Sequence, residues 1–133
     1  MRISRVQPDG MHPTPGYHNV TIVEAGRTAY LAGQCPLDES GALVGPGDLL
    51  AQTDQVAANA LAALSAAGAT PNDVVRSVIY VASGERADLS AVWQRLNAGP
   101  IAQAFTTAST LLGVTALGFP GQLVEVDLTA VAG

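Results

Sequence analysis

The stretch from residue 48 to residue 97 constrains the fold most, because its apolar residues change between helical and strand spacing. Its first part has apolar residues at intervals of seven, four and three, which place them on one face of a helix: Leu50, Ala57, Leu61 and Leu64. Asp48 is a typical N-cap residue and Gly68 a typical C-terminal stop, so we expect a helix over residues 49–67. Gln52 is expected on another face of this helix.

Two further elements follow in the same stretch. Residues 74–82, VVRSVIYVA, are typical of a strand that is buried on both faces. A second helix is predicted over residues 86–97, where the apolar side chains again share one face: Leu89, Val92, Trp93 and Leu96. Gly99 and Pro100 end it.

The flanking segments predict only strands. Residues 2–6 form a short first strand, and residues 18–24 and 27–34 form a hairpin with Ala25-Gly26 at its turn. Two more strands are expected over 106–114 and 122–132. The order of elements predicts one α+β domain over residues 1–133, a mixed sheet with two helices on one face. No element remains to cover the other face, so we expect a partner subunit there.

Composition restricts the partners. The chain is 48% hydrophobic and only 13% charged, which indicates a subunit interface or, alternatively, a large core. Its net charge is −5, and all six cations are arginines scattered along the chain, so nucleic acid is not expected as a partner. The absence of lysine excludes a Schiff-base lysine and a Walker-type phosphate lysine.

The few cysteine and histidine residues indicate neither a disulfide nor a metal. Cys35 is the single cysteine, we interpret it as a small buried hydrophobic residue, and it fits a reducing cytoplasm. His12, His18 and Cys35 lack metal-ligand spacing, so we expect no metal and no cofactor. No apolar run is long enough to span a bilayer, and the N-terminus lacks the apolar core of a signal peptide. We therefore expect a cytoplasmic protein that does not associate with membranes.

Several motifs occur together in a specific order. The segment YLAGQCPLDESGALV contains an Ala-Gly-Gln strand end and a Pro-Leu-Asp-x-x-Gly-x-Leu loop, and AAGATPNDVVRSVIYV follows after the long helix. Together with the closing LVEVDLTAVA, these motifs resemble the Rid (YjgF-type) family over nearly the whole chain, from Tyr17 to Ala132. The resemblance implies a chorismate-mutase-like fold and a homotrimer whose sheets form a central β-barrel. It also implies three ligand clefts between subunits, in which well-known members hydrolyse enamines and imines to 2-keto acids and ammonia.

The resemblance also assigns residues to the cleft. Glu125 matches the acidic residue that positions the hydrolytic water, and Tyr17 matches the cleft tyrosine, so both are candidate catalytic residues. Gly33 matches a glycine whose N–H binds the ligand, and Ala32 takes the place of a frequent serine. His18 is a candidate acid or base near neutral pH. The alternatives are a solvated strand face for Glu125, a capping tyrosine at the cleft mouth, a tight strand end at Gly33 and a half-exposed strand histidine.

One departure from the family pattern is pronounced. Deaminating relatives read Pro-Ala-Arg-Ser/Thr-Cys/Thr-Val, and that arginine pairs with the substrate carboxylate. Here Ser109 takes the place of the arginine, Thr110 follows, and Leu111 replaces the Cys or Thr. Both hydroxyl groups are able to bind a neutral ligand, or they are ordinary polar positions on a strand. Trp93 lines the cleft or, alternatively, belongs to the core.

Three functions are compatible with these observations. The first is a Rid-type hydrolase or lyase that acts on a carbonyl, enamine or imine substrate without the usual carboxylate. The second is a non-catalytic trimer that binds small metabolites. The third is the endoribonuclease or translation-inhibitor role attached to this family, against which the acidic charge balance argues.

Overall fold

The computed structural model describes residues 2–132, so the outermost positions of the predicted 1–133 domain lie outside the described residues. The strands are β1 (Ile3–Val6), β2 (Val20–Val23), β3 (Arg27–Tyr30), β4 (Val74–Val81), β5 (Ala108–Gly113) and β6 (Val124–Ala132). The helices are α1 (Leu49–Ala66) and α2 (Arg86–Asn97), with short 3₁₀ helices over Pro71–Asp73 and Ala102–Phe105. The predicted order of strands and α-helices is confirmed.

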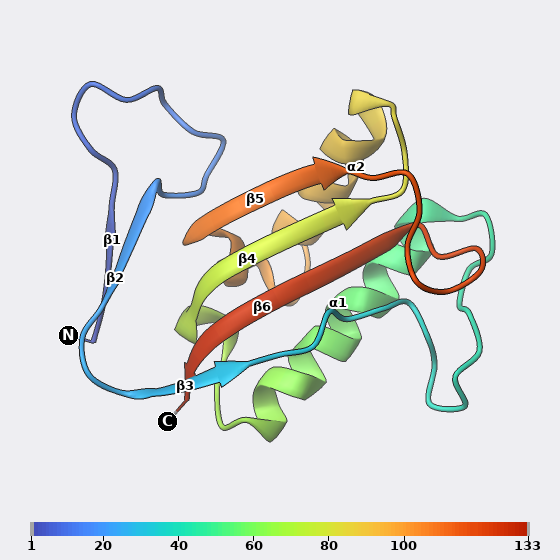
Figure 1. Ribbon diagram of the computed structural model, residues 1–133, viewed down its shortest axis with the longest axis horizontal. Coiled ribbons are helices and arrows are strands. Elements are labelled where there is room, and N and C mark those ends of the chain that lie inside the picture. The colour runs from blue at the N-terminus through green and yellow to red at the C-terminus, as the bar shows by residue number, and fades with distance from the viewer. Residues whose placement is uncertain (1, 133) are drawn as a thin grey trace.

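Four strands form a mixed sheet in the order β3-β6-β4-β5. β4 and β5 run parallel, joined by α2, whereas β6 is antiparallel to both β3 and β4. A parallel pair requires a long crossover, and the helix supplies it. Figure 1 shows α1 and α2 on the same face of this sheet. The α+β arrangement with two helices on one face is therefore confirmed.

The first two strands form a separate ribbon. β1 pairs with β2, and Figure 1 shows this ribbon apart from the four-stranded sheet. The predicted hairpin between residues 18–24 and 27–34 is therefore wrong, because β3 pairs with β6 instead. Residues 24–26 carry the chain from one sheet to the other, and Arg5 attaches the ribbon by donating to the carbonyls of Asn72 and Val74 at 2.8 and 2.9 Å.

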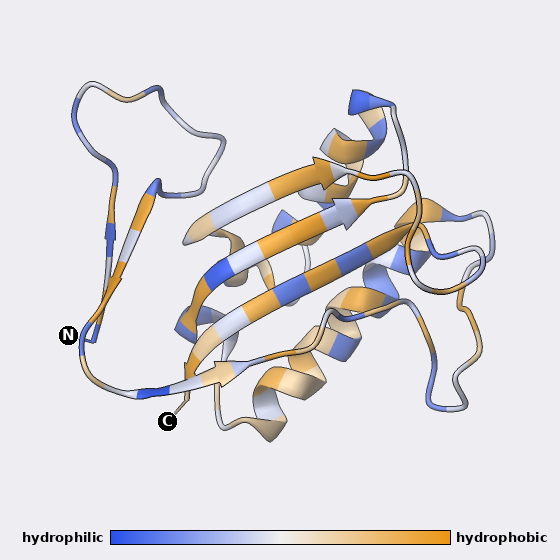
Figure 2. Ribbon diagram, in the orientation of Figure 1, coloured by the Kyte–Doolittle hydropathy of each residue, from blue (hydrophilic) through white to orange (hydrophobic). Residues whose placement is uncertain are grey.

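The core lies between the helices and one face of the sheet. In β6, the four residues that point to the helices are completely buried: Val124, Val126, Leu128 and Ala130. Figure 2 shows the alternation of apolar and polar residues along this strand. On the other face, Arg76 of β4 is exposed and Tyr80 is only half-buried. Within residues 2–132 the second face of β4 is therefore only partly covered, and its complete burial, which requires the expected partner subunit, stays a prediction.

Helix α1 begins as predicted but presents a different face to the core. The carboxylate of Asp48 accepts from the N–H of Ala51 at 3.0 Å, and Gly68 follows the helix with a φ of +72°. Leu50 and Leu61 remain 38% and 37% exposed, whereas Gln52 is fully buried. The predicted face of α1 is therefore partly wrong.

Three hydrogen bonds explain the burial of the Gln52 side chain. Its amide nitrogen donates to the carbonyls of Gly45 and Gly121, each at 3.1 Å, and its oxygen accepts from the N–H of Leu123 at 2.8 Å. A polar side chain is tolerated inside a protein when its hydrogen bonds are satisfied. Gln52 thus fixes α1 to two loops that are distant in sequence.

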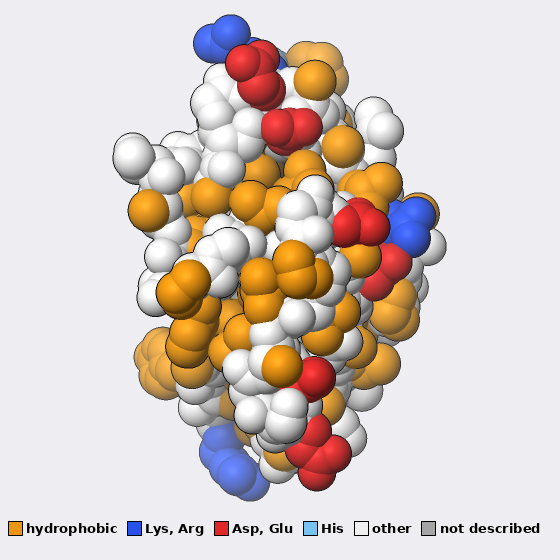
Figure 3. Space-filling model, turned by 90° about the vertical axis from the view of Figure 1, so that its right-hand side faces the viewer, with side chains coloured by type: hydrophobic (Ala, Val, Ile, Leu, Met, Phe, Trp, Pro, Cys, Tyr) orange, Lys and Arg blue, Asp and Glu red, His pale blue; other side chains and the backbone are white. Residues whose placement is uncertain are grey.

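Large apolar side chains remain on the surface of this single chain. Tyr30 is 81% exposed and Ile22 is 51% exposed. On the face shown in Figure 3, apolar side chains cover much of the surface and cations lie only at its margin. The predicted subunit interface stays a prediction. Within residues 2–132, no helix is both long and apolar enough to cross a membrane.

Candidate functional site

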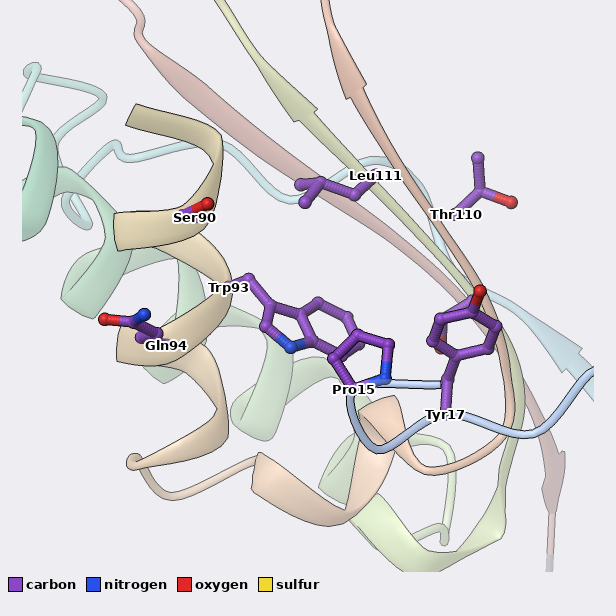
Figure 4. A pocket seen from close by; sticks show the side chains of 8 residues that line it. Pro15, Tyr17, Ser90, Trp93, Gln94, Thr110 and Leu111 are labelled. Atoms are coloured by element: carbon purple, nitrogen blue, oxygen red, sulfur yellow. The ribbon is translucent and has the colours of Figure 1, made fainter. Parts of the chain in front are cut away.

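A cavity of about 540 Å³ opens beside the edge strand β5. Eight residues from three segments line it: Pro15, Tyr17, Ser90, Trp93, Gln94, Ser109, Thr110 and Leu111. Five of these were assigned to the cleft by the family resemblance, and the fold brings them together from a loop, from α2 and from β5 (Figure 4).

Aromatic side chains form one wall of the cavity. The rings of Tyr17 and Trp93 meet edge to face, with centroids 6.3 Å apart and planes at 88°. Behind them the ring of Phe105 packs against the ring of Trp93, with centroids 6.0 Å apart. Trp93 therefore lines the cavity and also packs against the core, and its role in binding a ligand stays a prediction.

The loop between β1 and β2 carries Tyr17 to this wall. Gly16 adopts a φ of +125°, which favours glycine, and the hydroxyl of Thr14 donates to the carbonyl of Tyr17. His18 lies outside the cavity lining, and its Nδ1 bonds the carbonyl of Thr106. This contact favours the structural role for His18, because it fixes the loop to the start of β5.

Two hydroxyl groups of β5 contribute to the cavity. Ser109 Oγ lies 2.6 Å from Ser77 Oγ and 3.0 Å from the carbonyl oxygen of Thr107. The neighbouring Thr110 accepts a hydrogen bond of 2.7 Å from the guanidinium of Arg76. None of the described lining residues is charged, and Arg76 is connected to the cavity only through Thr110.

The remaining candidate residues lie elsewhere on the sheet. Gly33 faces the side chain of Glu125, and Ala32 is exposed next to it. Glu125 Oε1 accepts from the thiol of Cys35 at 3.3 Å and from the amide of Gln122 at 3.1 Å. Gln122 is 96% buried and is itself held by the carbonyl of Val124 and the N–H of Phe119. These bonds orient the carboxylate of Glu125.

The prediction for Cys35 is wrong. Cys35 is only half-buried, and its thiol donates to a carboxylate that is 90 positions away in the sequence. Burial raises the pKa of the Cys35 thiol, and the hydrogen bond to Glu125 and its negative charge raise it further. The thiol is therefore kept protonated, as a hydrogen-bond donor to Glu125 rather than as a nucleophile.

The two groups of candidate residues are separated within one chain. Glu125 lies opposite Tyr80 of β4, and Tyr80 lies opposite Leu112 of β5. Two strand spacings amount to about 10 Å. The cavity belongs to the β5 edge of the sheet, whereas Gly33 and Cys35 follow β3 at the opposite edge.

Sequence reasoning missed some members of both groups. Ser90 precedes Trp93 by one helical turn, so it lies on the same helix face, and helical periodicity would have identified it once Trp93 was assigned to the cleft. Pro15 and Gln94 adjoin predicted residues without a signal of their own. Gln122 carried no signal, because its contact with Glu125 depends on the turn before β6. Among residues 2–132, no group of three histidine, cysteine or acidic residues is arranged to hold a metal ion.

Comparisons with known proteins agree with the fold. Residues 10–132 match the family model described as Endoribonuclease L-PSP. Protein DfrA of Myxococcus xanthus is 34% identical over 118 residues, which cover 87% of this chain and 85% of DfrA. The crystal structure of YyfB of Yersinia pestis, a Rid-family protein of unknown function, superposes with a TM-score of 0.89 at 39% identity and covers 98% of this chain and 99% of YyfB. Rv2704 of Mycobacterium tuberculosis, a member of the YjgF/YER057c/UK114 family, gives a TM-score of 0.59 at 28% identity, with 98% and 99% coverage.

Proposed function

This chain belongs to the Endoribonuclease L-PSP family, also called Rid or YjgF, and from this membership we propose that it binds or converts a small carbonyl, enamine or imine metabolite. The ligand occupies the cavity beside β5. The chain is not an efficient 2-imino acid deaminase, because Ser109 stands where the deaminating relatives have an arginine. The uncharged lining of the cavity is the observation that carries this proposal.

A substrate carboxylate needs a partner once it leaves water. An isolated charge in a partly apolar cavity is costly unless a cation or several hydrogen bonds compensate for it. Loss of a buried bidentate arginine costs binding about 2–5 kcal/mol. That free energy corresponds to roughly tens- to thousands-fold in affinity. A neutral ligand avoids this loss, and the hydroxyl groups of Tyr17, Ser109 and Thr110 suit it.

Glu125 supplies the chemistry in the catalytic form of this proposal. Its carboxylate is oriented by Gln122 and Cys35 on Oε1, and Oε2 faces Gly33. An oriented carboxylate is able to accept a proton from water that attacks the imine carbon, to which an enamine is first converted by tautomerisation. The proton is then returned to the nitrogen, the C–N bond breaks and ammonia leaves as the carbonyl forms. Tyr17 orients the ligand or the water from the cavity side.

The two halves of the site meet between subunits in this proposal. β5 is one edge of the four-stranded sheet and carries the hydroxyl groups of the cavity, whereas Glu125 lies on β6, the neighbour of the opposite edge strand β3, and Gly33 follows β3. A head-to-tail contact that joins the β5 side of one chain to the β3 side of the next is heterologous, and such contacts form a ring when the rotation between neighbouring chains closes. We place three chains in the ring, and a native mass measurement that finds monomers would contradict this assembly.

Imine hydrolysis tests the proposal directly. 2-Iminobutyrate or 2-iminopropionate is generated in situ, and keto-acid release is followed. We expect release far below that of arginine-bearing relatives, and a gain for Ser109→Arg. Ser65→Arg is the matched control, because Ser65 is exposed on α1. A wild-type rate equal to that of arginine-bearing relatives would contradict the role assigned to Ser109.

A binding measurement separates turnover from recognition. Neutral carbonyl compounds are expected to raise the melting temperature, and Glu125→Gln is expected to retain this shift while losing any turnover. A shift without turnover in the wild-type chain indicates the non-catalytic binder. The endoribonuclease role is disfavoured by the net charge of −5, and tight, salt-dependent RNA binding would reverse that conclusion.

A further inference from the structure

We propose that Ser109 presents a hydrogen-bond acceptor to the cavity, so that the ligand is a neutral compound that donates an N–H group, of the primary-amide or lactam class. This inference rests on the proposed function and narrows its substrate class. It follows from the position of the single hydroxyl proton of Ser109.

The proton of Ser109 is committed to the backbone. Its oxygen lies 3.0 Å from the carbonyl oxygen of Thr107, and a carbonyl oxygen only accepts. Ser109 must therefore donate in this bond. Its only other carbonyl contact among the described residues is Phe105, at 3.5 Å, where it would also have to donate.

The bond to Ser77 then has a fixed direction. Ser77 is completely buried, and its Oγ lies 2.6 Å from Ser109 Oγ. Because Ser109 has no second proton, Ser77 is the donor and occupies one of the two lone pairs of Ser109. The second lone pair remains, and Ser109 lines the cavity. The group offered to a ligand is thus an acceptor.

An acceptor at this position reverses the selectivity of an arginine. A guanidinium has only hydrogen-bond donors and therefore suits a carboxylate. The oxygen of Ser109, whose proton is already donated to Thr107, offers a carboxylate only a lone pair, and two acceptors repel each other. An ester is neutral but has no proton to give. A primary amide or a lactam brings an N–H group to Ser109, and its planar group suits the aromatic wall of Tyr17 and Trp93.

Thr110 does not replace Ser109 in this role. Adjacent residues of a strand point to opposite faces of the sheet, and the oxygen of Thr110 accepts from Arg76. The hydroxyl proton of Thr110 remains available, which makes it a donor. Ser109 therefore decides whether an N–H group is favoured on the helix side of β5.

Three probes that share the 2-oxobutanoyl group test the inference: 2-oxobutanamide, methyl 2-oxobutanoate and 2-oxobutanoate. Their dissociation constants are measured by calorimetry on the full chain. We expect the amide to bind roughly three- to tenfold more tightly than the ester, the range of one net hydrogen bond. The carboxylate should bind most weakly.

Ser109→Ala provides the decisive comparison. It should reduce the amide-to-ester ratio to about one, while binding of the ester persists. Ser65→Ala, an exposed serine on α1, should leave the ratio unchanged. Equal binding of amide and ester by the wild type, or an unchanged ratio in Ser109→Ala, overturns the inference but leaves the proposed function intact. Binding of none of the three probes overturns both.

Discussion

The carboxylate of Glu125 occupies the space beside Gly33 in which any other residue would place its β-carbon. A β-carbon on Gly33 would lie 2.7 Å from Cδ of Glu125 and closer still to Oε2. Glycine is therefore favoured here by the close approach of the Glu125 side chain rather than by an unusual backbone conformation.

Gly33→Ala should displace this carboxylate without unfolding the protein. The end of a glutamate side chain is flexible, so we expect a loss of stability below about 1 kcal/mol. The contact of Glu125 with Cys35 should be disturbed, together with any turnover that depends on Glu125. Urea unfolding and turnover are the measurements. Gly118→Ala is the control, because a β-carbon there meets nothing within 4 Å. A loss of several kcal/mol would show that the carboxylate cannot move.

Glu125→Gln should make Cys35 more reactive. The carboxylate raises the pKa of the thiol, so removing its charge lowers that pKa and increases the thiolate fraction near pH 8. The pH profile of alkylation by iodoacetamide should therefore shift to lower pH. Asp127→Asn removes a neighbouring charge on the same strand face and should shift the profile less. An unchanged profile in Glu125→Gln would refute the contact.

Gln52→Ala should be among the most destabilising changes of a polar residue. It removes three hydrogen bonds and leaves the carbonyls of Gly45 and Gly121 without their side-chain donor. We expect a loss of about 2–4 kcal/mol in urea unfolding. Gln103→Ala, at an exposed position, should change little. A loss of less than about 1 kcal/mol would mean that other donors replace Gln52.

The ion pair between Asp54 of α1 and Arg95 of α2 should stabilise the folded protein slightly, and this stabilisation should be lost in acid. Arg95 bonds both oxygens of Asp54, at 2.8 and 2.6 Å, and these bonds lower the pKa of that carboxyl. Because this pKa is lowered in the folded state, the ion pair stabilises the folded protein at pH values above the pKa of the unfolded chain, which is about 3.9. This stabilisation is lost as the pH falls through the folded pKa.

Asp54→Asn should therefore destabilise only slightly at pH 7, because both side chains are about half exposed. The difference from wild type should disappear near pH 2. Melting temperatures at both pH values check this, and a difference that persists in acid would require another explanation.

The sequence predicted the elements whose boundaries are set locally. Asp48 and Gly68 delimit α1, and the Gly99-Pro100 pair ends α2, because caps and helix breakers act on their immediate neighbours. The pairing of β3 was not predictable in this way. Periodicity identifies a strand but not its partner, and β6 lies about a hundred residues further along the chain.

Burial of polar residues also escaped prediction. The spacing of apolar residues on α1 places Gln52 away from the core. Its burial could not be predicted, because its partners, the carbonyls of Gly45 and Gly121, come from loops that are distant in sequence. The family resemblance named five residues that line the cavity, and spacing alone would not have found them. Contacts between distant segments, such as Cys35 with Glu125, required the structure.

The separation of the candidate residues between the β5 edge of the sheet and the side formed by β6 and β3 has a genetic consequence. In the proposed ring, a chain defective in the cavity and a chain defective at Glu125 complement each other. A random mixture restores about a quarter of the clefts, since each cleft draws one half from each of two neighbours. Two inactive alleles would then yield partial function when they are expressed together, although neither functions alone.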